Sequence, residues 1–221
     1  MLLIFDLDDT LYKVSPVLSS IRKRKIINLI AKYKKIDYQK AKNLLESERR
    51  KLMAEKKKYT TTAVLQHLRI PISAFYEVLN KIDTKKYIIS YKNIYDVLRN
   101  ISKNNDIVVL SNSPYDIVSK TIQYLKIKKF IKKIYTPEIL GDEKPSKKIL
   151  KKICNDMGYE FENCISIGDS IHKEILPAKF LGMKTVLLIN KRHKIPKEQI
   201  KIADFVIKDI EELPEILKQV G

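Results

Sequence analysis

The chain has 221 residues, 44% of them hydrophobic and 32% charged, and a formal net charge of +18. This length suits one domain, or one domain that carries a smaller one, with enough apolar residues for a buried core. No apolar run approaches the roughly 18 residues that cross a bilayer, and the amino terminus lacks the features of a signal peptide. We therefore expect a soluble cytoplasmic protein without a membrane partner.

The positive charge is concentrated in one segment. Residues 20–60 contain 15 Lys and Arg against 4 Asp and Glu, a net of +11, which leaves +7 for the rest of the chain. Such a surface attracts anionic substrates, nucleic acid or acidic membranes. A solvated helical face in a protein rich in lysine and isoleucine explains the same charge equally well, so both interpretations stay open.

The first dozen residues carry the strongest local signal. The apolar run Leu2–Phe5 has the length of a strand and ends in Asp6, Asp8 and Asp9, followed by Thr10. Carboxylates this close at the end of a buried strand repel one another unless a cation lies among them. A hard divalent cation such as Mg²⁺ is the natural occupant, whereas the simpler alternative is a strand that ends in an acidic turn.

Between residues 15 and 85 the hydrophobic pattern is helical, with apolar residues at spacings of three and four. Helix starts are predicted at Pro16, Asp37, Tyr59–Thr62 and Ser73. This segment is predicted to be an all-helical insertion.

From residue 86 onward, apolar runs of strand length alternate with helical patterns. Strands are predicted around 107–110, 134–135, 164–167, 185–189 and 205–207. After the last of them, Asp209 and Glu212 have the spacing of a capping box. Alternation of this kind is typical of a parallel sheet covered by helices.

The two patterns predict an α/β fold, with a doubly wound parallel sheet formed by residues 1–14 and 86–221 and an all-helical domain formed by residues 15–85. Ligands bind such a sheet at the carboxyl ends of its central strands. Polar residues follow three predicted strands there: Asp6 and Asp8, Ser111 and Asn112, and Asp169. A hydroxyl followed by exposed backbone amides suits a phosphate oxygen.

The segment Phe5–Leu11 resembles the first motif of the haloacid dehalogenase (HAD) superfamily, in its phosphatase branch. The resemblance implies a Rossmann-like core in which Asp6 is the nucleophile and Asp8 the general acid and base. An aspartyl phosphate would split one difficult displacement into two easier ones, and each half moves a proton in the opposite direction.

The second and third motifs of the superfamily are also matched. The resemblance implies that Ser111 and the backbone amide of Asn112 bind the phosphoryl group. Lys144, which precedes a proline at a predicted helix start, matches the lysine that offsets the negative charge. Thr10 and Glu174 are expected to support the site. Glu174 replaces the usual aspartate and could reach the metal through water or hold Lys144.

The fourth motif resembles residues 168–174, in which Asp169 matches the family's metal ligand. The resemblance therefore implies a Mg²⁺ ion bound by the carboxylates of Asp6 and Asp169 and by the backbone carbonyl of Asp8.

The histidines and cysteines have no predicted part in the chemistry. His172 is expected in an exposed loop, and His67 and His193 have no partner at metal-ligand spacing, so zinc is not expected. Cys154 and Cys164 do not form a disulfide framework and are expected to be buried free thiols.

These observations predict a Mg²⁺-dependent phosphatase that hydrolyses a small phosphate monoester, such as a nucleoside monophosphate or a sugar phosphate, through an aspartyl phosphate. The helical insertion is expected to close over the site and select the substrate. Residues 5–12 and 59–62 are most similar to the pyrimidine 5′-nucleotidase-like subgroup, although the threonines are equally typical of a helix start.

Three alternative functions remain open or are disfavoured by the sequence. A phosphomutase shares the motifs, and a dehalogenase is disfavoured because its motif does not need Asp8. The third alternative is not an enzyme. It is a basic nucleic-acid-binding or scaffold protein in which the catalytic site is an inactive relic. Nothing in the sequence specifies the substrate or the oligomeric state.

Overall fold

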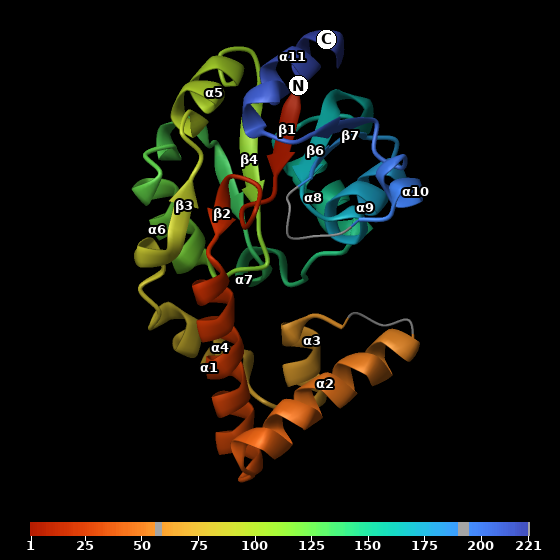
Figure 1. Ribbon diagram of the computed structural model, residues 1–221. Helices are drawn as coiled ribbons and strands as arrows, with labels where there is room; N and C mark the ends of the chain where they lie inside the picture. Colours follow the sequence, from red (N-terminus) through yellow and green to blue (C-terminus); the bar gives the residue numbers. More distant parts are fainter. Residues whose placement is uncertain (56–58, 190–194, 221) are drawn as a thin grey trace. The chain divides into compact units, whose positions relative to one another are not determined.

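The computed structural model describes residues 1–55, 59–189 and 195–220. The chain divides into two compact units. The first unit comprises Met1–Val14 and Ile88–Gly221, and the second, called here the helical unit, comprises Ser15–Tyr87 (Figure 1).

The first unit is built on a six-stranded sheet in which every pairing is parallel. The spatial order is β5-β4-β1-β6-β7-β8. The strands are β1 (Leu2–Phe5), β4 (Asp106–Leu110), β5 (Lys133–Tyr135), β6 (Cys164–Gly168), β7 (Lys184–Leu188) and β8 (Phe205–Ile207). The chain runs outward from β1 through β4 and β5 and then returns to the other side of β1, so the order reverses beside β1. The predicted doubly wound parallel sheet is confirmed.

The central strand β1 is buried on both faces, and none of its four residues is more than 2% exposed. A strand that is covered on both sides needs a continuous apolar run rather than an alternating one. Leu2 and Ile4 join an apolar cluster that includes Ile149 and Ile153.

Helices lie between the strands of the first unit along the chain, and a final helix follows the last strand. They are α5 (Ile94–Ile101), α6 (Tyr115–Tyr124), α7 (Pro137–Leu140), α8 (Lys147–Met157), α9 (Leu176–Lys179), α10 (Lys197–Ile200) and α11 (Leu213–Val220). The predicted capping box at Asp209 and Glu212 is present and begins the short 3₁₀ turn Ile210–Glu212 that leads into α11.

A short antiparallel ribbon was not predicted from the sequence. It pairs β2 (Tyr12–Val14) with β3 (Ile88–Ser90), and Lys13 lies opposite Ile89. Lys13 interrupts β2 and Ser90 ends β3, so neither segment is a continuous apolar run, unlike the equally short β8, whose three residues are all apolar.

The helical unit contains α1 (Pro16–Lys34), α2 (Tyr38–Ala54), α3 (Thr61–His67) and α4 (Ile72–Asn80), followed by the 3₁₀ turn Thr84–Tyr87 (Figure 1). Side-chain caps begin the first three helices: Ser15, Asp37 and Thr60 accept hydrogen bonds from the backbone N–H three residues later. α1 packs against α2 and α4.

The prediction that Ser73 caps the fourth helix is wrong. α4 begins at Ile72, directly after Pro71, and has no side-chain cap. Because the fixed φ of proline already turns the chain at residue 71, Ser73 lies inside the first helical turn.

In the described part of the chain, no helix combines the length and apolar character needed to cross a bilayer. The cytoplasmic location stays a prediction.

Candidate active site

Three strands of the first unit end in polar residues at one edge of the sheet. Asp6 follows β1, Ser111 follows β4 and Asp169 follows β6. β1 lies between β4 and β6, with Phe5 opposite Val109 on one side and Ile167 on the other. The ladder continues one residue further, since Asp6 N–H donates to the carbonyl of Ile167 at 2.9 Å. Residues that are more than a hundred positions apart in the sequence therefore meet at this edge.

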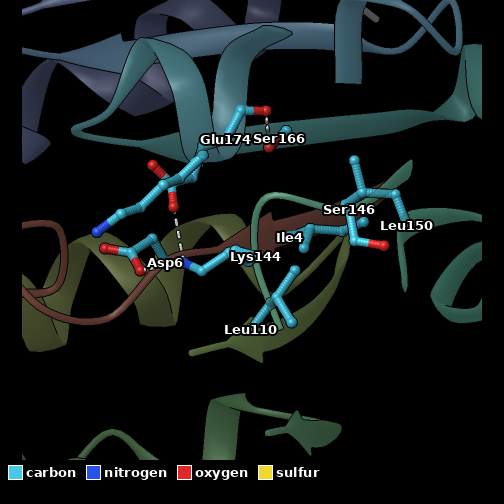
Figure 2. Close-up of a pocket in the computed structure, with 9 residues that line it drawn as sticks. Ile4, Asp6, Leu110, Lys144, Ser146, Leu150, Ser166 and Glu174 are labelled. Atoms are coloured by element: carbon cyan, nitrogen blue, oxygen red, sulfur yellow. Dashed lines mark hydrogen bonds and ion pairs between the residues drawn. The ribbon is translucent and has the colours of Figure 1, made fainter. Parts of the chain in front are cut away.

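Lys144 lies at the centre of this edge and is only 3% exposed. Its Nζ forms an ion pair with Oδ1 of Asp6 and lies 2.7 Å from Oε1 of Glu174. Thr10 Oγ1 donates to the other Asp6 oxygen, Oδ2, at 2.9 Å. Figure 2 shows the lysine between the two carboxylates, beside a small pocket lined on its apolar side by Ile4, Leu110 and Leu150.

The electrostatics keep Lys144 protonated. Burial alone would lower its pKa, but the carboxylates of Asp6 and Glu174 raise it above the ordinary value. Burial also raises the pKa of Glu174, and the charge of Lys144 opposes that rise. The lysine and its two carboxylates therefore form one buried charged cluster.

Asn112 holds the backbone of Lys144. Its side-chain Nδ2 donates to the Lys144 carbonyl at 2.9 Å, and the Lys144 N–H donates to Asn112 Oδ1 at 2.8 Å. A primary amide carries one donor side and one acceptor side, so it can pair with a peptide group in this two-bonded way. The resemblance implied a role only for the backbone amide of Asn112, so this side-chain contact was not predicted.

Glu174 reaches Lys144 because residue 168 is glycine. A Cβ at Gly168 would lie 2.4 Å from Cγ of Glu174, a distance that no real contact has. Glu174 belongs to the single π-helical turn Ile171–Ile175, and its Oε2 accepts the Ser170 N–H at 3.1 Å. Of the two contacts considered for Glu174, the structure shows the one with Lys144.

Asp8 is held by two hydroxyl groups that the sequence analysis did not single out. Ser113 Oγ donates to Asp8 Oδ2 at 3.1 Å, and the Tyr12 hydroxyl donates to Asp8 Oδ1. Ser113 closes the polar run after β4, and this position was the signal that could have identified it. The neighbouring Asp9 instead accepts the Val14 N–H at 2.9 Å.

Asp169 carries the clearest sign of crowded negative charge. Burial, together with the nearby carboxylates of Asp6, Glu174 and Asp9, raises its pKa to about 8. A cation bound beside this carboxylate would stabilise its ionised form and relieve the repulsion between the carboxylates. Within the described ranges no cage of three or more His, Cys, Asp or Glu side chains exists. Mg²⁺ usually binds one or two carboxylates and keeps several waters, so the predicted ligands fit it.

Comparison with protein-family models identifies the family of this chain. The model of haloacid dehalogenase-like hydrolases matches residues 3–188. The chain belongs to this family. A relative from Methanocaldococcus jannaschii, a glyceraldehyde 3-phosphate phosphatase, is 28% identical over 98% of this chain and 96% of its own length.

Solved structures of HAD proteins share the fold. A HAD phosphatase from Thermococcus onnurineus has a TM-score of 0.73 and 17% identity, over 97% of this chain and 96% of its own. A HAD-hydrolase from Bacillus subtilis, solved bound to magnesium, has a TM-score of 0.65 and 19% identity, over 98% of this chain and 97% of its own. These structures confirm the predicted fold, and the family model and the relative described above confirm the predicted family and the enzyme class, a phosphoric monoester hydrolase.

The histidines and cysteines are the residues to which the sequence assigns no part in the chemistry. His172 is exposed, and His67 pairs with Glu48 at 3.0 Å. His193 lies outside the described residues. Cys154 and Cys164 are buried free thiols, as predicted.

Proposed function

We propose that this HAD hydrolase is a Mg²⁺-dependent phosphatase that hydrolyses a small phosphorylated metabolite through an aspartyl phosphate on Asp6. The observation that carries the proposal is the setting of Asp6. Its carboxylate lies at the carboxyl end of the central strand, oriented by Lys144 on one oxygen and by Thr10 on the other. A nucleophile needs such fixed orientation to attack in line.

Two carboxylates divide the reaction between them. In the first half, an oxygen of Asp6 bonds to phosphorus, and the protonated carboxyl of Asp8 gives its proton to the departing alcohol. In the second half, Asp8 takes a proton from the water that attacks the phosphoryl group, which frees inorganic phosphate and regenerates Asp6. The hydroxyls of Ser113 and Tyr12 keep the Asp8 carboxyl in one orientation.

The phosphoryl oxygens need positive charge and hydrogen-bond donors. We assign the Ser111 hydroxyl, the backbone amide of Asn112 and the ammonium of Lys144 to this role. Asp6, the Asp8 carbonyl and Asp169 would hold Mg²⁺. When bound, the ion supplies charge that offsets the carboxylates and the phosphoryl group. The superfamily includes a hydrolase solved bound to magnesium.

We propose that the helical unit acts as the cap that selects the substrate. The unit, Ser15–Tyr87, ends two residues beyond the predicted boundary of residues 15–85. Sugar phosphates are the favoured substrate class, because a relative that covers nearly the whole chain is a glyceraldehyde 3-phosphate phosphatase. The similarity to pyrimidine 5′-nucleotidases stays a prediction, so nucleoside monophosphates belong in the same substrate panel.

The deciding experiment measures phosphate release from triose phosphates, other sugar phosphates and nucleoside monophosphates, with Mg²⁺ and with a chelator. Asp6→Asn should reduce turnover by at least about 10³-fold, because it removes the nucleophile. Asp96→Asn is the matched control: it makes the same chemical change at an exposed position of α5, and should retain most activity. Turnover by Asp6→Asn at the wild-type rate would refute the assignment.

A second candidate function is nucleic-acid binding through the helical unit, because residues 20–60 carry a net charge of +11. Binding of duplex nucleic acid that weakens steeply with salt would support this function.

A phosphomutase would instead transfer the phosphoryl group to a second sugar phosphate. Product analysis in the same substrate panel distinguishes a phosphomutase from a phosphatase.

A further inference from the structure

The two cysteines of the chain touch each other in the core of the first unit. Cys154 lies on α8 and Cys164 is the first residue of β6, and both are completely buried. Their sulfur atoms are 3.3 Å apart. Since the chain contains two cysteines in all, neither thiol has another internal partner for covalent pairing.

We propose that Cys154 and Cys164 form a reversible disulfide bond that staples α8 to β6. A disulfide has an S–S distance of about 2.0 Å, so the two sulfurs must approach by only about 1.3 Å in total. The side chains already point at each other across the contact between helix and strand. The closed loop is short, because the cysteines are ten positions apart.

The surroundings also favour exchange chemistry at this pair. The pKa of Cys154 lies below its ordinary value because Cys164 hydrogen-bonds to its sulfur, while the same contact and burial raise the pKa of Cys164. The thiolate is the reactive form in exchange, and either cysteine can supply it, because either sulfur can be the donor in their contact.

The oxidant is a low-molecular-weight disulfide. When Cys154 is the thiolate, it attacks one sulfur of this disulfide, breaks the S–S bond and releases one thiolate. The Cys164 thiol then loses its proton, and its sulfur attacks Sγ of Cys154 and displaces the second thiolate. Two protein thiols thus lose two electrons and two protons, and the external disulfide becomes two thiols. Because both sulfurs are buried, exchange takes place during folding or from a locally opened state.

The staple lies at the end of the elements that is remote from the active-site residues. Cys164 begins β6, whereas Asp169 follows the end of that strand, and Cys154 lies in the later half of α8, whereas Lys144 precedes its start. The bond should therefore raise stability without changing the geometry around Lys144.

The test uses the full chain, equilibrated with reduced or oxidised glutathione in mild denaturant so that the core opens, and then refolded. Acid quenching, alkylation of the unfolded chain and mass spectrometry count the thiols. We expect the oxidised sample to contain a monomer two hydrogen atoms lighter, with neither cysteine alkylated. Its Tm should exceed that of the reduced sample by roughly 5 °C.

The double variant Cys154→Ala/Cys164→Ala is the control, and its Tm should not respond to glutathione. Two alkylatable thiols after oxidation, or only glutathione adducts and dimers linked between chains, would overturn the proposal. The result does not depend on the proposed phosphatase activity, because thiol count and Tm are read without a substrate.

Discussion

Both units of the molecule carry exposed ion pairs, but among the described residues the first unit also has a buried one. In the helical unit, ion pairs such as Lys23–Glu46 have side chains that are 54% and 44% exposed. In the first unit, Lys144 and Glu174 form an ion pair with both side chains 4% exposed. Exposed pairs contribute little to stability because water and salt screen them. A buried charge is costly unless its partners are in place. The stability of the buried cluster therefore depends on the exact positions of its side chains.

The largest expected effect comes from breaking the buried cluster. Lys144→Met leaves the Asp6 and Glu174 carboxylates without their cation, so we expect turnover to fall about 10³-fold and the free energy of unfolding to fall by about 3–5 kcal/mol. Phosphate release and urea denaturation measure the two effects. Lys148→Met, at an exposed position of α8, should leave both nearly unchanged; equal effects at the two positions would contradict this account.

Gly168→Ala tests the space that Glu174 occupies. The added methyl group would collide with the Glu174 side chain, which must then move away from Lys144. We expect a loss of about 1–3 kcal/mol in stability and a drop in turnover. Glu174→Gln serves as the comparison, because it keeps the shape and removes only the charge. Wild-type stability and turnover in Gly168→Ala would contradict this account, because they would show that the Glu174 side chain can move aside without loss.

The carboxylate of Asp169 predicts a pH dependence. Its pKa of about 8, against an ordinary 3.8, means that the folded, metal-free protein binds a proton there that the unfolded chain has released. Stability without metal should therefore fall as pH rises from about 4 to 8. Mg²⁺ binds the ionised form and competes with that proton, so the increase in Tm caused by Mg²⁺ should be larger at pH 8 than at pH 6.

Thermal unfolding with and without MgCl₂ across this pH range measures the effect. Asp169→Asn should remove most of the dependence. An increase in Tm that is the same at pH 6 and pH 8 in the wild-type protein would contradict the assignment.

The smallest expected effect is at the surface. Removal of the pair Lys23–Glu46 by double alanine substitution should change the free energy of unfolding by about 0.5 kcal/mol or less, beyond the change in helix propensity. A double-mutant cycle measured by urea denaturation isolates the coupling energy. A coupling as large as that of the buried cluster would remove the contrast between the two units.

Much of the local structure could be predicted from the order of residues. An apolar run followed by Asp6 marked the central strand, the spacing of Asp209 and Glu212 marked a capping box, and Asp37 marked a helix start. Such signals depend on residues only a few positions apart, so they can be recognised from the sequence alone. Ser73 shows the limit, because the preceding proline had already begun the helix.

The contacts that organise the site could not be predicted in this way. The pairing of Lys144 with Asp6 spans 138 positions, that of Ser113 with Asp8 spans 105, and that of Asn112 with Lys144 spans 32. Each depends on which strands lie side by side and in which register, and these are set by packing of the whole sheet. Sequence motifs named most of the participants, but folding brought them together and set the partners of each.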